Sequence, residues 1–334
     1  MTAVFFGELM LRLSPPGREL LLQTPKLEVN VGGAEANVAT GLACLGHKVR
    51  MVSAVADNPL GAAVIGELRR RGVDTSTVAS EAGRLGLYFL TPGAGLRASE
   101  VVYDRAGSVF ATRAADSWDW DTALAGATRL HLSGITPALG PNSAAAAIAA
   151  AEAAAARGVP VSFDGNYRAK LWEAWDSDPK AVLTKLIGHA DILFGNHRDI
   201  SLLLGKAFSG DGADRRREAS EAAFAAFPKL QTIANTARHV VDADSHRVSA
   251  RVDTRSGGHQ TDEVTIAGIV DRIGAGDAFA AGVLHGLSKG GDAAFAAQSG
   301  LALTALKHSL PGDASLFAQA DIDAFLEGEL DVRR

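Results

Sequence analysis

The strongest constraint on the fold of this chain is an alternation of short apolar segments with helical segments, which begins near residue 129. The apolar segments at 130–132, 159–163 and 192–194 have the length of buried strands, and the helical pattern covers 142–157, 179–188 and 214–227. Strands that alternate with helices in this way favour a parallel sheet with helices on both faces. We therefore expect an α/β, doubly wound, mostly parallel sheet.

The first third of the chain adds to this pattern and also interrupts it. Residues 4–6 and 49–55 suit strands, and residues 34–45 and 59–71 suit helices, of which the first should stop at Gly46. The segments 9–31 and 86–113 lack helical periodicity, and the first of them is rich in proline and glycine. We expect them to pair as a small β appendage on a single domain that covers 1–334, because no linker separates two units.

Composition excludes several classes of function. The 334 residues are 47% hydrophobic with a net charge of −5, which disfavours nucleic acid and membrane surfaces as partners. Cys44 is the only cysteine, so no internal disulfide forms and a reducing cytoplasm is expected. The opening segment lacks the pattern of a signal peptide, and the alanine-rich run at 143–156 is too short to span a bilayer.

The segment that suggests chemistry is Gly274-Ala275-Gly276-Asp277, which runs directly into a strong helix-forming stretch. Glycines let the backbone approach a ligand, and free N–H groups at a helix start favour an anion such as phosphate. A carboxylate at this position suits the acceptance of a hydroxyl proton during phosphoryl transfer. Alternatively, Asp277 only complements the helix dipole, and these residues alone do not decide between the two roles.

Other common site motifs are absent from the sequence. No Gly-x-x-x-x-Gly-Lys-Ser/Thr loop and no Gly-x-Gly-x-x-Gly turn after the first strand occurs. The sequence also lacks a His-Glu-x-x-His helix and paired cysteines that would indicate zinc.

Two signatures resemble those of the ribokinase-like (PfkB) sugar kinases. Asp271-x-x-Gly274-Ala275-Gly276-Asp277-x-Phe279 is similar to the C-terminal signature, and the segment from Gly32 to Ala39 is similar to the N-terminal one. The resemblance implies a ribokinase-like fold with a small β-sheet lid formed by about 9–31 and 86–113. It also implies ATP and Mg²⁺, leaves room for a monovalent cation, and suggests a homodimer that forms through the lid.

The resemblance assigns roles to individual residues. Asp277 would be the catalytic base, and the N–H groups of Gly274, Ala275 and Gly276 would hold the developing charge. Gly32, Gly33 and Asn37 would line the sugar site.

Further segments resemble the 2-keto-3-deoxygluconate kinases of this family, among them 7–15, 103–108, 163–172 and 306–313. A sugar acid carries a carboxylate, which a planar guanidinium binds by paired hydrogen bonds. This resemblance supports Tyr88, Tyr103, Arg105 and Arg168 as substrate contacts. The alternative for either arginine is a structural ion pair, for example with Asp104 or Asp164.

The nucleotide side departs from the family pattern at two places. The family often has Asn-x-x-Glu where this chain has Asn196-His197-Arg198-Asp199, and it often has a glycine-containing turn near 233–238, whose glycines are missing here. Candidate donor contacts are Asn166, Asn196, Asn235 and Thr236, with Asp199 and Asp271 as candidate magnesium ligands. Arg238 is a further candidate, and the role of Arg272 is left open.

Two other functions compete with the sugar acid kinase. One is a kinase for a neutral sugar, of the fructokinase or ribokinase type, and Arg105 and Arg168 discriminate against it only if they converge on one cavity. The other is a catalytically silent sugar- or nucleotide-binding protein, which the intact Asp277 motif disfavours.

Overall fold

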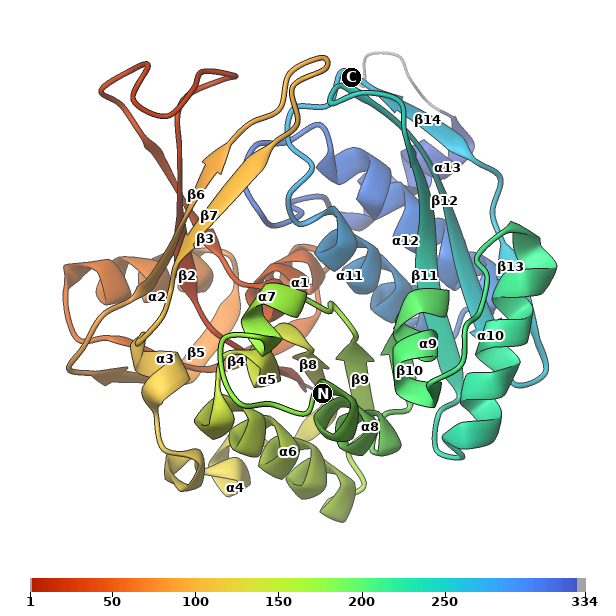
Figure 1. Cartoon of the computed structure of the whole chain (residues 1–334), viewed down its shortest axis with the longest axis horizontal. Helices are drawn as coiled ribbons and strands as arrows, with labels where there is room; N and C mark the ends of the chain where they lie inside the picture. The colour runs from red at the N-terminus through yellow and green to blue at the C-terminus, as the bar shows by residue number, and fades with distance from the viewer. Residues whose placement is uncertain (1, 329–334) are drawn as a thin grey trace.

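A computed structural model describes residues 2–328 of the chain (Figure 1). Its main feature is a ten-stranded sheet with the order β13-β12-β11-β10-β9-β8-β1-β4-β5, in which β14 also pairs with β12. In this order, each strand from β11 to β5 runs parallel to its neighbours within that group. The strands β12, β13 and β14 form an antiparallel edge. The strands of this sheet are β1 (Thr2–Phe6), β4 (Lys48–Ala56), β5 (Val73–Glu81), β8 (Ala127–Ser133), β9 (Val161–Asp164), β10 (Ile192–Phe194), β11 (Thr232–Val240), β12 (Ser245–Thr254), β13 (Gly257–Gln260) and β14 (Val264–Ala267).

Helices cover both faces of this sheet, as apolar strands buried on two sides require. Helix α11 packs against both α1 and α12, and α8 packs against both α6 and α9. The helices are α1 (Ala34–Cys44), α2 (Pro59–Arg70), α3 (Val109–Thr112), α4 (Trp120–Ala123), α5 (Ile135–Ala138), α6 (Pro141–Ala156), α7 (Ala169–Trp172), α8 (Pro179–Gly188), α9 (His197–Leu204), α10 (Gly212–Ala226), α11 (Ala275–Ser288), α12 (Ala293–Lys307) and α13 (Gln319–Glu327), with a 3₁₀ turn at Ala115–Ser117. No helix within residues 2–328 is long and apolar enough to cross a membrane.

A second sheet of four strands projects from the body of the molecule at the left of Figure 1. Its order is β3-β2-β6-β7, from β3 (Glu28–Gly32), β2 (Met10–Ser14), β6 (Gly86–Thr91) and β7 (Glu100–Asp104). We call it the lid sheet. The pairing of β2 with β6 joins two segments that lie far apart in the sequence.

The strand order of the large sheet indicates where a ligand should bind. Strand β1 lies between β4 and β8: the chain first adds β4 and β5 on one side of β1 and then crosses to add β8 on the other side, which creates a switch point. In open α/β sheets, ligands bind beside the carboxyl ends of strands at such a point. Here the residues that follow these ends include Glu8 after β1, Ile135 after β8 and Asn166 after β9.

The expected fold class is confirmed: the sheet is mostly parallel, helices flank it, and a small separate sheet is present. The helix from Ala34 ends at Cys44 and is followed by Gly46 in a left-handed conformation. Sequence patterns did not assign β5 or the strands β12 to β14, and residues 109–112 form α3 rather than a strand.

Candidate active site

A cavity of about 580 Å³ lies between the lid sheet and the start of α11, and we call it the lid cavity. It brings together the candidate donor contact Asn166 and most of the residues that the sequence assigned to catalysis and substrate binding: Gly33, Asn37, Tyr88, Tyr103, Arg105, Arg168, Gly274, Ala275, Gly276 and Asp277. Gly32 directly precedes this set at the end of β3, and a side chain on it would collide with Tyr88 and Asp313. Arg105 and Arg168 therefore converge on one cavity.

Asp277 lies in the first turn of α11, which begins after Gly274 in the left-handed conformation at φ 77°. Its Oδ2 accepts a hydrogen bond of 2.6 Å from Nδ2 of Asn37 on α1. Segments 240 positions apart in the sequence thus meet at one carboxylate. The contact also fixes the direction of the side chain, which a role limited to the helix dipole would not require.

The electrostatic environment raises the pKa of Asp277 to about 7. Loss of hydration is the main cause, the charges of Asp313 and Glu35 add to it, and the Asn37 hydrogen bond and the Arg168 charge oppose it. A general base is most effective when its pKa is close to the working pH. The site therefore gives Asp277 the acidity that a proton acceptor needs near neutrality.

Two further carboxylates lie beside Asp277. Glu35 on α1 is buried, accepts bonds from the Ser133 N–H and from the hydroxyls of Ser133 and Thr136, and has a pKa raised by burial. Burial also raises the pKa of Asp164 at the end of β9, and the charges of Asp277 and Asp199 raise it further. The mutual repulsion of these carboxylates favours the protonated form of Asp164 and of Asp277.

Arg105 forms an ion pair, but its partner is Glu8 rather than Asp104 or Asp164. Its Nε donates to Oε2 of Glu8 at 2.8 Å, its Nη2 donates to the same oxygen, and both side chains are buried. Ser108 donates to the other oxygen of Glu8, while Asp104 pairs with Arg84. Because Glu8 engages Nε and Nη2 only, the Nη1 donors of Arg105 stay free to bind a ligand in the lid cavity.

Tyr88 and Tyr103 are direct cross-strand neighbours in the lid sheet, with ring centroids 5.7 Å apart. The hydroxyl of Tyr88 donates to Oδ2 of Asp313, and Arg12 of β2 pairs with Asp313 at 3.1 Å. This network connects the lid sheet with the loop after α12. Arg168 is exposed and forms no ion pair within residues 2–328, so its guanidinium is available to an anion.

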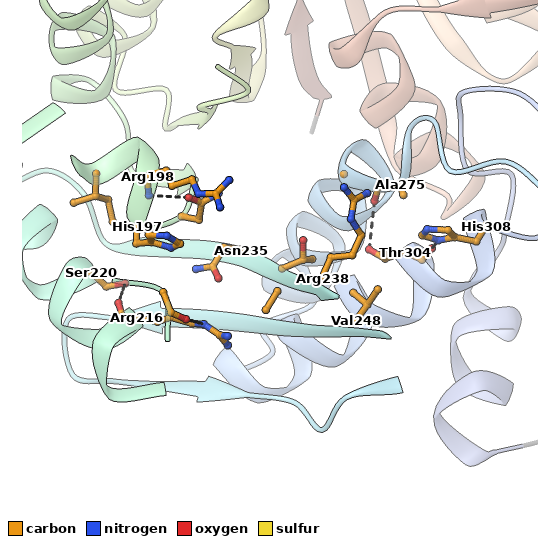
Figure 2. A pocket seen from close by; sticks show the side chains of 16 residues that line it. His197, Arg198, Arg216, Ser220, Asn235, Arg238, Val248, Ala275, Thr304 and His308 are labelled. Atoms are coloured by element: carbon orange, nitrogen blue, oxygen red, sulfur yellow. Dashed lines mark hydrogen bonds between the residues drawn. The ribbon is translucent and has the colours of Figure 1, made fainter. Parts of the chain in front are cut away.

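Two more cavities continue from the lid cavity toward the antiparallel edge of the sheet. A cavity of about 730 Å³ is lined by Asn166, Asn196, Asp199, Asn235 and Thr236, and we call it the middle cavity. A cavity of about 480 Å³ extends past Asn235 and Thr236 to His197, Arg216 and His308, and we call it the edge cavity (Figure 2). Gly276 lines all three cavities, so the start of α11 is where they meet.

The backbone at two of these positions is specialised. Asn166 has a positive φ of 36°, which is uncommon outside glycine and often marks a functional site. Asn196 and Asp199 form a capping box on α9: Oδ1 of Asn196 accepts from the Arg198 N–H, and Oδ2 of Asp199 accepts from the Asn196 N–H at 2.8 Å. Because Oδ2 of Asp199 accepts this capping bond, a cation can bind only at the remaining lone pairs of the Asp199 carboxylate.

Asp271 has structural partners for both of its oxygens. Oδ1 accepts from the Ile273 N–H, while Oδ2 accepts from the Gly312 N–H and pairs with Arg12 at 2.7 Å. It does not line the lid, middle or edge cavity. Within residues 2–328 there is also no group of three or more His, Cys, Asp or Glu side chains spaced to bind a metal.

Glu8, Glu35 and Asp313 also line the lid cavity, and no sequence pattern assigns them a role there. Glu35 lies two residues after the di-glycine, so an acid at that point was a signal that could have been used. Glu8 and Asp313 become recognisable only through their partners, which lie about 100 and 225 positions away.

Comparisons with known proteins agree with this geometry. The model of the pfkB family of carbohydrate kinases matches residues 2–318. The chain belongs to the PfkB family. It is therefore a carbohydrate kinase, and members of this family use ATP as the phosphate donor.

Individual relatives match over nearly the full length. The chain is 32% identical to a 2-dehydro-3-deoxygalactonokinase of Haloferax volcanii, over 98% of each chain. It is 29% identical to a 2-dehydro-3-deoxygluconokinase of Bacillus subtilis, over 94% of this chain and 91% of the relative. A solved 2-dehydro-3-deoxygluconokinase of Thermotoga maritima has a TM-score of 0.92 and 38% identity, over 98% of this chain and 100% of the other.

Proposed function

We propose that this PfkB kinase transfers the γ-phosphate of ATP to the terminal primary hydroxyl of 2-dehydro-3-deoxygluconate and produces the 6-phosphate. The observation that carries the proposal is the convergence of Asp277, held by Asn37, with Arg105 and Arg168 in the lid cavity. The base and the arginines suit the two ends of one sugar acid, a hydroxyl and a carboxylate. Relatives that are named for sugar acids support the same substrate class.

In this mechanism Asp277 accepts the proton of the sugar hydroxyl. The hydroxyl oxygen forms a bond to the γ-phosphorus, and the bond from that phosphorus to the bridging oxygen breaks, so that ADP leaves with the electron pair. The N–H groups of Gly274, Ala275 and Gly276 face the charge that develops on the phosphoryl oxygens. The helix dipole of α11 acts in the same direction.

The remaining contacts divide between the two substrates. Gly32, Gly33, Asn37, Tyr88 and Tyr103 would surround the sugar, because they lie at the lid side of Asp277. The donor would occupy the middle and edge cavities, where the candidate contacts are Asn166, Asn196, Asn235 and Thr236.

Magnesium, which the family implies, suits Asp164 and Asp199. Both lie in or next to the middle cavity, and the repulsion between them contributes to the raised pKa of Asp164. Mg²⁺ usually binds one or two carboxylates together with substrate phosphates, so a larger protein ligand set is not needed. The ion would neutralise charge on the donor phosphates. Asp271 fits this role less well, because Arg12 and two N–H groups already bind its oxygens.

A coupled assay of ADP release, run over a panel of sugars, tests the proposal. We expect turnover with 2-dehydro-3-deoxygluconate and little with fructose or ribose. Asp277→Asn should lower kcat at least about 10³-fold while ATP still binds, because the amide cannot accept the proton. Near-normal turnover by this variant would exclude Asp277 as the base, and the same kcat/KM for fructose as for the acid would refute the sugar acid assignment.

The galactonate-derived epimer is a second candidate acceptor, because the relative from Haloferax volcanii is named for it. The two acids differ in the configuration of one hydroxyl, so both belong in the panel, and the ratio of their kcat/KM values decides between them. A silent binding protein would bind ATP and release no ADP with any sugar.

We also propose that two copies of the chain associate through the lid sheet. One face of this sheet lines the lid cavity with Tyr88 and Tyr103. On the other face, Val29, Leu13, Phe89 and Val102 are successive cross-strand neighbours and form an apolar row. Val29 and Val102 are 58% and 50% exposed, and contiguous exposed apolar surface of this kind often marks a protein–protein interface.

A further inference from the structure

Two arginines at the junction of the three cavities have no partner within the protein. Arg238 on β11 lines the lid, middle and edge cavities, and Arg272, in the loop before α11, lines the lid cavity. Neither guanidinium forms an ion pair or a hydrogen bond within residues 2–328. Figure 2 shows the Arg238 side chain extending toward Ala275, at the start of α11.

The positive charges of Arg238 and Arg272 are close enough to act on each other. Arg238 is exposed at the mouth of the cavities; partial loss of hydration lowers its pKa, and the charge of Arg272 lowers it further. The same two charges, after burial, help to lower the pKa of His246 to about 4. The nearest acid on the Arg272 loop, Asp271, is already bound by Arg12. Like charges that are held together without a counter-ion indicate a site for an anion.

The position of the pair identifies the anion. Arg238 shares with Gly276 the point where the donor cavities open toward Asp277. A sugar carboxylate would lie at the lid end of the lid cavity, near Arg105, whereas the terminal phosphates of the donor must pass this junction to reach the hydroxyl. Guanidinium groups bind phosphate oxygens by paired hydrogen bonds, and they stabilise the charge of a phosphoryl group in transfer.

We propose that Arg238 and Arg272 form a guanidinium pair that binds the β- and γ-phosphates of ATP and stabilises the transferring phosphoryl group opposite the N-terminus of α11. The inference rests on the proposed function for the identity of the reaction. It adds that this chain, which lacks the family's glycine turn near residue 235, uses two arginine side chains at this place. Both residues are then catalytic residues that contact the donor.

Single substitutions measured by binding as well as by turnover test the pair. Arg238→Gln and Arg272→Gln should weaken the binding of magnesium-free ATP and of inorganic tripolyphosphate about 10-fold or more by calorimetry, with adenosine binding unchanged. Turnover should fall about 10²- to 10³-fold, with the KM for the sugar acid nearly constant. Arg→Lys variants should restore part of the binding and little of the turnover. Arg215→Ala is the control, because Arg215 is exposed on α10 and pairs with Glu218.

The outcomes separate this inference from the proposed function. If wild-type protein binds tripolyphosphate through both arginines but phosphorylates no sugar acid, the pair stands and the proposed substrate fails. If ATP and tripolyphosphate bind the two Gln variants as tightly as wild type, or if only the KM for the sugar rises, the inference is overturned. Thermal melts identify a variant that has lost its fold, and the Lys variant at the same position then decides through tripolyphosphate binding.

Discussion

At the scale of single residues, the contact between Asn37 and Asp277 sets the pH range of the reaction. The carboxylate has a pKa raised to about 7, mainly by loss of hydration, and the Asn37 hydrogen bond holds the pKa below the value that burial alone would give. Only the deprotonated form can accept a proton. We therefore expect kcat/KM to rise with pH through about 7 and to level off above it.

Asn37→Ala should move this rise to higher pH. Removal of the amide withdraws a bond that favours the charged carboxylate, so the pKa of Asp277 increases, by about one unit for one hydrogen bond to a charged group. The measurement is the pH profile of kcat/KM, together with the KM for the sugar, which should also rise if Asn37 contacts it. Asn142→Ala removes an exposed amide that bonds only to the carbonyl oxygen of Thr112, and it should leave the profile unchanged. An unchanged acid limb in Asn37→Ala would show that this bond does not tune the base.

At the scale of elements, the turn before α11 depends on one glycine more than on its neighbour. Gly274 has a φ of 77°, and a Cβ atom on it would collide with the main-chain oxygen of Asp313. Gly276, two residues later, has no atom within 4 Å of the place that a Cβ would take. The fold therefore requires glycine at position 274, whereas at position 276 only a ligand in the cavities would require it.

Gly274→Ala and Gly276→Ala should consequently differ in stability. We expect the first to lower the free energy of unfolding by more than about 2 kcal/mol, through backbone strain and the displaced Asp313 loop. The second should change it by less than about 1 kcal/mol, since alanine is favoured over glycine inside a helix. Urea denaturation of both proteins provides the comparison. Equal stabilities would mean that the turn relaxes freely and does not fix the position of α11.

The same elements explain what the sequence could and could not predict. The alternation of strands and helices indicated the parallel sheet, because βαβ units leave a local pattern of apolar lengths. The strands β12 to β14 of the antiparallel edge were not assigned from the sequence, because they lie outside the βαβ pattern. Arg105 was expected near a ligand, yet its partner Glu8 lies 97 positions away and follows only from the pairing of β2 with β6. Long-range ion pairs of this kind depend on tertiary structure, which a single sequence does not show.

At the scale of the whole molecule, the lid sheet has two faces with different chemistry. Its inner row, Asn30, Arg12, Tyr88 and Tyr103, follows the cross-strand register and includes the ion pairs that join the lid to Asp271 and Asp313. The outer row in the same register is apolar. Alternation along a strand puts every second residue on the same face, so the sequence that builds the cavity wall also builds the outer surface.

The apolar outer row of the lid sheet bears on the oligomeric state of the protein. Val29→Glu and Val102→Glu place a charge on the exposed lid face and should convert a dimer into a monomer, because an unpaired charge at the centre of an apolar interface is strongly unfavourable. Sedimentation velocity at several protein concentrations measures the state. Leu326→Glu is the matched control, since Leu326 is an exposed leucine, 40% accessible, on α13 and away from the lid sheet. A wild-type monomer at tens of micromolar, or dimers that persist in both lid variants, would refute association through this face. If dissociation also raises the KM for the sugar, the partner supports the lid in the position that closes the cavity over its substrate.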